Sequence, residues 1–90
     1  MNKGELVAEL AAQTELSQKA AQEAVNKLIE IITDRLVKGD SVNLTGFGSF
    51  IVRERKARIA HNPRTRAEIQ IPARKAPDFK PGKSLKDAVN

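Results

Sequence analysis

The chain has 90 residues, a formal net charge of +5 and no cysteine, so it has the size of one small domain and cannot use disulfides or thiolate-bound metal to support its core. No apolar run approaches the roughly 20 residues that span a bilayer. The first residues also lack the apolar region of a secretory signal, so we expect a cytoplasmic protein that makes no membrane contact.

Two helices are predicted in the first half of the chain. Apolar residues recur at helical spacing over residues 2–13, and Asn2 is a suitable N-cap for this segment. A second helix is predicted over residues 18–38, from an N-cap at Ser17 to Gly39 just past its end. The apolar residues of this second helix cover too wide an arc for a single neighbour, so we expect a partner subunit to cover part of it.

The pattern changes to alternation of polar and apolar residues after residue 40. Residues 41–45 and 49–55 predict two strands, and the glycine-rich residues 46–48 predict the turn between them. We expect the sheet to contribute five apolar side chains to the core: Val42, Leu44, Phe47, Phe50 and Val52.

Residues 53–74 predict a long hairpin that carries almost no core residues. The dipeptide Asn62-Pro63 marks the turn at its tip. Pro72 restricts the returning strand to an edge or irregular position, because proline cannot donate a ladder hydrogen bond. A two-stranded hairpin of this kind is marginally stable alone, so we expect an arm that is mobile without a ligand.

The last segment predicts an extended connector over residues 76–82, anchored by Phe79, and a short helix over residues 83–89. We therefore expect a single domain over residues 1–90. Its parts are a helical dimerisation part over residues 1–40, a sheet with its arm over residues 41–82, and a C-terminal helix over residues 83–90.

The positive charge is concentrated in the second half of the chain. Residues 1–45 hold five Lys+Arg against seven Asp+Glu, a net charge of −2, whereas residues 46–90 hold eleven against four, a net charge of +7. A one-sided positive field is typical of a protein that binds a polyanion. Arginine dominates the arm, and its planar, weakly hydrated guanidinium group suits a narrow electronegative groove.

A set of short motifs spreads over the chain in a fixed order. They are Met1-Asn2-Lys3, Leu16-Ser17, Lys38-Gly39-Asp40, Gly46-Phe47-Gly48-Ser49-Phe50, Val52-Arg53-Glu54-Arg55, Asn62-Pro63-Arg64-Thr65, Glu68-Ile69-Gln70-Ile71-Pro72-Ala73 and Phe79-Lys80-Pro81-Gly82-Lys83. In their residues and their order, over essentially all 90 residues, these motifs resemble those of the bacterial histone-like HU and integration host factor family. The resemblance implies an α+β fold in an intertwined dimer, with a helical body, a β-saddle and two extended β-hairpin arms.

The same resemblance implies the function of a histone-like architectural protein of the nucleoid. Such a protein binds double-stranded DNA through the minor groove with little sequence specificity, and it bends and compacts the duplex. Pro63 would be the residue that intercalates between base pairs. No catalytic residue, metal or cofactor is implied. The DNA-binding residues implied by the resemblance are Lys3, Arg53, Arg55, Arg58, His61, Asn62, Pro63, Arg64, Thr65, Arg66, Arg74, Lys80, Lys83 and Lys86.

Three positions of the arm depart from the commoner family pattern. Ala60 and Arg66 stand where glycine is frequent, so we expect the tip to differ in geometry or to strain Arg66. His61 stands where arginine is frequent, which weakens one phosphate contact near neutral pH and makes that contact dependent on pH.

Several alternatives remain open from the sequence. One is a sequence-specific DNA bender of the integration host factor kind, and another is a basic protein that binds RNA or single strands. The chain has no Tyr and no Trp, which disfavours binding by base stacking. A helix-turn-helix is disfavoured because the second helix mixes charge signs on its polar face. An enzyme is disfavoured because a single His cannot assemble a catalytic group. The partner subunit is expected to be an identical chain, and a paralogue remains an alternative.

Overall fold

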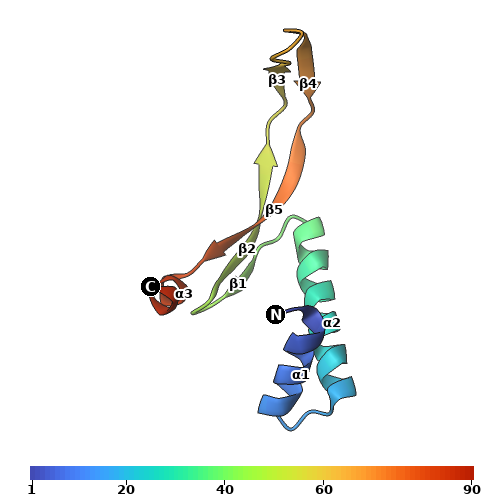
Figure 1. Cartoon of the computed structure of the whole chain (residues 1–90), viewed down its shortest axis with the longest axis vertical. Helices are drawn as coiled ribbons and strands as arrows, with labels where there is room; N and C mark the ends of the chain where they lie inside the picture. The colour runs from blue at the N-terminus through green and yellow to red at the C-terminus, as the bar shows by residue number, and fades with distance from the viewer. The chain divides into compact units, whose positions relative to one another are not determined.

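The computed structural model describes all 90 residues and shows an α+β fold (Figure 1). The chain forms two compact units, Met1–Asp34 and Arg35–Asn90. None of its helices is both long enough and apolar enough to cross a membrane. The elements in chain order are α1 (Lys3–Gln13), α2 (Gln18–Val37), β1 (Val42–Leu44), β2 (Gly48–Arg55), β3 (Arg58–His61), β4 (Glu68–Ile71), β5 (Arg74–Pro81) and α3 (Lys83–Val89).

Side-chain caps define the starts of the first two helices, and both predicted N-caps are confirmed. The Oδ1 atom of Asn2 accepts a hydrogen bond from the backbone N–H of Glu5 at 2.9 Å. The Oγ atom of Ser17 accepts one from the backbone N–H of Ala20 at 3.1 Å. Such caps satisfy N–H groups that have no partner inside the helix. The far end of α2 is followed by Gly39 at φ +85°, the left-handed conformation that glycine adopts readily.

The core of the first unit is small. It consists of Val7 from α1 and of Ala21 and Val25 from α2, with Leu10 and Ala11 packed against them. These residues recur at helical spacing, which brings one face of each helix against the other. Three to five side chains are few for a hydrophobic core, so the single chain buries little of the apolar surface of α2.

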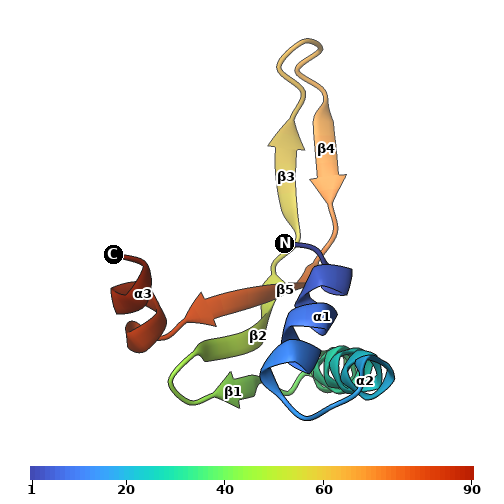
Figure 2. The ribbon, with the colours of Figure 1, turned by 60° about the horizontal axis from the view of Figure 1, so that its bottom comes forward.

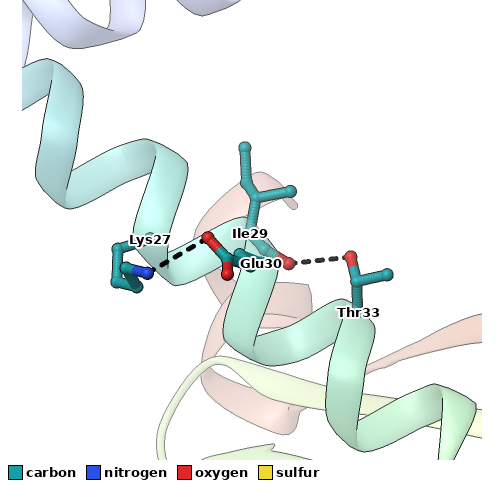
Figure 3. Close-up of polar contacts among 4 residues, drawn as sticks. All are labelled: Lys27, Ile29, Glu30 and Thr33. Atoms are coloured by element: carbon teal, nitrogen blue, oxygen red, sulfur yellow. Dashed lines mark hydrogen bonds and ion pairs between the residues drawn. The ribbon is translucent and has the colours of Figure 1, made fainter.

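Several large apolar side chains of α2 are open to solvent. Leu28, Ile29 and Ile31 are 53%, 49% and 49% exposed. Figure 3 shows the polar contacts beside them: Lys27 Nζ lies 3.2 Å from Glu30 Oε2, and the Thr33 hydroxyl donates to the carbonyl of Ile29 at 2.8 Å. These contacts run along the helix and satisfy its polar groups. They leave the apolar side chains uncovered.

The second unit is built on a long antiparallel ladder. Strands β1, β2 and β5 form a three-stranded sheet in the order β1–β2–β5, and β3 pairs with β4 in a separate two-stranded sheet. The β2–β5 register runs from Gly48 opposite Pro81 to Arg55 opposite Arg74. The β3–β4 register resumes with Arg58 opposite Ile71. Neither strand gains a residue across the interruption, so the arm continues the ladder of the sheet (Figures 1 and 2).

The interruption falls where residues 56–57 face residues 72–73. Pro72 lies in this gap and has no N–H to donate to a neighbouring strand. The structure thus confirms that Pro72 occupies an irregular position between two regular stretches. The predicted hairpin is also confirmed, with Asn62-Pro63 in its turn.

The segment predicted as an extended connector is part of the sheet. Residues 76–82 are extended as expected, and all but Gly82 belong to β5, which pairs with β2 along its whole length. This strand contains two prolines, at positions 77 and 81. Strand β5 lies at the edge of the sheet, where one side needs no ladder partner, and an edge strand tolerates proline.

Phenylalanine rings gather on one face of the sheet around Gly48. The ring centre of Phe79 lies 5.4 Å from that of Phe47 and 5.0 Å from that of Phe50. A Cβ atom on Gly48 would lie 2.6 Å from Phe79 Cζ and 2.7 Å from the carbonyl oxygen of Lys80, so only glycine fits there. Phe47 and Leu44 remain exposed in the single chain, which means that their predicted burial is not achieved by this chain alone.

Candidate nucleic-acid interface

Strand alternation places the predicted DNA-binding residues of the sheet together. Successive side chains of a strand point to opposite faces, and cross-strand partners share a face. The register of β2 and β5 therefore puts residues 49, 51, 53 and 55 on the same face as residues 74, 76, 78 and 80. We call this surface the basic face. It carries four cationic side chains from the predicted set: Arg53, Arg55, Arg74 and Lys80.

The opposite face of the same two strands has a different character. It carries the rings of Phe50 and Phe79, and further along it Glu54 lies opposite Lys75. Neither Glu54 nor Lys75 belongs to the predicted DNA-binding set. The charges of this pair have opposite sign, so this face is compensated whereas the basic face has an excess of positive charge.

The basic face contains a direct electrostatic conflict. Arg55 and Arg74 are cross-strand partners, so two like charges stand opposite each other. Like charges in this position destabilise a strand pair. Both side chains are exposed, and neither forms an ion pair. An anion bound between or above these guanidinium groups would remove the repulsion, which makes this end of the sheet suited to a phosphate.

Asp78 is the one acidic residue on the basic face. Its Oδ2 atom accepts a hydrogen bond from Arg53 Nε at 2.6 Å, and its Oδ1 atom accepts one from the backbone N–H of Phe79 at 2.9 Å. The hydrogen bond from Arg53 and then the one from the Phe79 N–H hold the pKa of the Asp78 carboxyl below its ordinary value of 3.8. Desolvation opposes this shift, and the positive charges of Arg53 and Arg55 make a smaller contribution in the same lowering direction. Sequence reasoning missed this residue, although its spacing of two from Lys80 was a usable signal.

The arm distributes its predicted residues over both faces. Arg58 lies opposite Ile71, and His61 lies opposite Glu68. Arg58 and His61 are three positions apart on β3, so their side chains point to opposite faces of the hairpin. His61 therefore faces a carboxylate rather than a second cation. The structure brings Arg58 together with apolar side chains and does not bring it together with His61.

The tip of the arm is organised by Asn62. Its N–H donates to the carbonyl of Ala67 at 2.9 Å, and its carbonyl accepts from the N–H of Arg66 at 2.7 Å. Its side-chain Oδ1 also accepts from the N–H of Arg64 at 2.9 Å. These three bonds enclose Pro63, the residue between Asn62 and Arg64. The Asn62 side chain thereby fixes the position at which the proline ring is presented.

Arg66 and Ala60, which stand where the family frequently has glycine, differ in backbone conformation. Arg66 has φ +58°, so the strain expected where glycine is frequent is present. Ala60 lies in regular β3 opposite Ile69 and needs no left-handed conformation. On the other side of the tip, Thr65 Oγ1 accepts from the N–H of Ala67 at 3.3 Å, which helps to close the turn.

The remaining predicted cations lie on helices. Lys83 is the first residue of α3 and Lys86 follows three residues later, a spacing that puts both on one side of the helix. The start of α3 is held by Gly82, whose carbonyl accepts from the N–H of Lys86 at 3.1 Å. Lys3 belongs to the other unit, where it is the exposed first residue of α1.

Comparison with known proteins identifies the family. A family model described as "Bacterial DNA-binding protein" matches residues 1–90. The chain is 58% identical over 90 residues to DNA-binding protein HU-1 of Halalkalibacterium halodurans, with 100% of both chains covered. It is 55% identical over 89 residues to DNA-binding protein HU 1 of Bacillus subtilis, covering 99% of this chain and 97% of that protein.

Solved structures agree with the sequence comparison. The Anabaena HU–DNA cocrystal structure superposes with a TM-score of 0.90 at 43% identity, covering 99% of this chain and 97% of that one. Both comparisons confirm the resemblance that the motifs indicated. With its basic face, its arm and a family match over its full length, the chain belongs to the family of bacterial DNA-binding proteins, among relatives named HU.

Proposed function

We propose that this protein is a histone-like architectural protein that binds and bends double-stranded DNA with little sequence specificity. The observation that carries this proposal is the register of β2 and β5, which collects Arg53, Arg55, Arg74 and Lys80 on one face. The relative crystallised with DNA shares this fold over nearly the whole chain and supports the same ligand. The protein acts as a binding protein rather than as an enzyme, and its site is a surface rather than a pocket.

Affinity for DNA comes mainly from phosphate contacts. Cations that neutralise phosphates release condensed counterions, so binding weakens steeply as salt rises. The basic face, together with Lys83 and Lys86 on α3, supplies these contacts. Phosphates repeat regularly along any duplex, so this part of the interface carries no sequence information. The minor groove adds little sequence information, because its pattern of hydrogen-bond donors and acceptors is nearly the same for different base pairs.

The arm supplies the bending. It extends the ladder beyond the sheet without a change of register and carries few apolar contacts of its own. Pro63 stands at its tip, held by the three hydrogen bonds of Asn62. A rigid apolar ring in this place enters between base pairs from the minor groove and unstacks them. The arm residues Arg58, His61, Arg64 and Arg66 lie along the groove, and the added contacts offset the energy of bending.

The functional form is a homodimer in which the 90 residues of each chain act as one domain. Each unit has too few buried side chains to be stable alone, and α2 exposes large apolar residues along its length. A second copy that covers these residues completes the core, as small domains often require. Two arms then flank one duplex. The protein resides with the chromosomal DNA in the cytoplasm, as part of the nucleoid.

A salt titration tests the function directly. Binding of the protein to a duplex of about 35 base pairs is measured at several salt concentrations, with the duplex intact and with a central nick. We expect steep salt dependence and tighter binding to the nicked duplex, because a nick lowers the energy of bending. Steep salt dependence without a preference for the nick would retain DNA binding and exclude the wedge. Absence of binding at low salt would refute the proposal.

A further inference from the structure

A carboxylate at the centre of a surface that binds a polyanion needs an explanation. Asp78 shares the basic face with four cationic side chains, and it is the only acidic residue there. Its charge repels the phosphates that the surrounding residues attract. The carboxyl is ionised at neutral pH, because its ordinary pKa of 3.8 is far below 7 and the hydrogen bonds from Arg53 and the Phe79 N–H lower the pKa further.

The contacts of Asp78 fix it in place and direct it at one partner. One carboxylate oxygen is held by the backbone N–H of Phe79 and the other contacts Arg53 Nε. Asp78 lies opposite Ile51 in the register, so its contact with Arg53 is diagonal across the strands. The ion pair joins residues 25 positions apart, and it is the only one in the chain that is not local to a helix.

The pair is exposed enough to exchange partners. The side chains of Arg53 and Asp78 are 56% and 46% exposed, so a phosphate can approach the guanidinium group from solvent. A phosphate oxygen and a carboxylate oxygen seek the same donors, and both form charge-assisted hydrogen bonds with arginine. An exposed ion pair is weak, which allows one anion to replace the other.

We propose that Asp78 is an internal competitor of the DNA backbone, occupying Arg53 in the free protein so that a phosphate must displace it. This inference rests on the proposed DNA binding and specifies how one site of that surface is regulated. Because Arg53 is already neutralised by Asp78, its contact with DNA exchanges one ion pair for another and adds little to counterion release. Asp78 thus lowers both the affinity of the basic face for DNA and the salt dependence of binding.

The test compares Asp78→Asn with a matched control, Glu54→Gln. Both substitutions remove one negative charge from the same pair of strands, but Glu54 lies on the opposite face, beside Arg53 in sequence. Asparagine keeps the shape of aspartate and an oxygen that accepts from the Phe79 N–H. The readout is the affinity for a 35-base-pair duplex of random sequence as a function of salt.

We expect Asp78→Asn to bind roughly fivefold more tightly at low salt and to steepen the logarithmic salt slope by about 0.9 for each Arg53 contact, or about 1.8 per dimer. Glu54→Gln should change the slope much less. Equal effects of the two substitutions would overturn the inference, since they would reflect net charge alone. Weaker binding by Asp78→Asn would also overturn it and would show that Asp78 positions Arg53 for the phosphate.

A second pair of variants isolates the role of Arg53. In an Arg53→Met background, Asp78→Asn should gain no more affinity than Glu54→Gln does, because the guanidinium group that Asp78 occupies is absent. A full gain in that background would contradict displacement from Arg53. Failure of the unsubstituted protein to bind the duplex would refute the proposed function itself. If the unsubstituted protein binds, but Asp78→Asn and Glu54→Gln change affinity and salt slope equally, only the competition between Asp78 and phosphate is refuted.

Discussion

The clearest consequence of the β2–β5 register is that two adjacent cations should differ in their effect on DNA binding. Arg74 lies on the basic face opposite Arg55, and Lys75 lies on the other face opposite Glu54. Replacing either residue by Gln removes one positive charge and changes the net charge of the protein equally. We expect Arg74→Gln to remove one phosphate contact per chain and Lys75→Gln to remove none.

The size of the effect follows from counterion release. One phosphate contact contributes about 0.9 to the logarithmic salt slope, so the two copies of Arg74 in a dimer contribute about 1.8. Between 50 and 200 mM salt, the affinity deficit of Arg74→Gln should therefore shrink about twelvefold. Fluorescence anisotropy with a labelled duplex measures both slopes. Equal slopes for the two variants would refute the assignment of the faces and with it the basic face.

Three further predictions concern the fold. Gly48→Ala should lower the free energy of unfolding by about 1–3 kcal/mol, because its Cβ would overlap Phe79 and the backbone of Lys80. Gly4→Ala in α1 serves as the control and should not destabilise the protein. Equal melting temperatures for the two variants would contradict this prediction. The melting temperature should fall on dilution, because dissociation uncovers α2; a concentration-independent value would indicate a stable monomer. The pKa of Asp78, followed by NMR, should lie below 3.8 and should rise toward 3.8 in Arg53→Met. The stability contributed by this pair is therefore present at neutral pH and is lost only as pH falls through the lowered pKa. An unchanged pKa in Arg53→Met would show that Arg53 is not the main partner of Asp78.

Local rules predicted the helices and the arm well. The caps at Asn2 and Ser17 and the glycine that follows α2 each depend on a few neighbouring residues, and each has the expected geometry. The strain at Arg66 was equally predictable, since it depends on one backbone angle at one position. Such features need no knowledge of which segments meet in space.

Features that depend on strand pairing were harder to predict. Residues 76–82 were expected to be an extended connector, because sequence alone does not reveal that this segment pairs with β2 as an edge strand. The pairing of Arg53 with Asp78 requires the register between segments 25 residues apart. The separation of Arg58 from His61 onto different faces also follows only once β3 is known to be regular. The candidate residues were thus identified from the sequence, but their grouping was not.

Insertion of Pro63 by the arm should bend DNA, and bending can be measured separately from binding. Fluorescence energy transfer between the ends of a 35-base-pair duplex reports the end-to-end distance at saturating protein. We expect a large rise in transfer with the unsubstituted protein and a much smaller rise with Pro63→Ala, while the affinity of the variant falls only modestly. Equal transfer by the two proteins at saturation would show that Pro63 does not produce the bend.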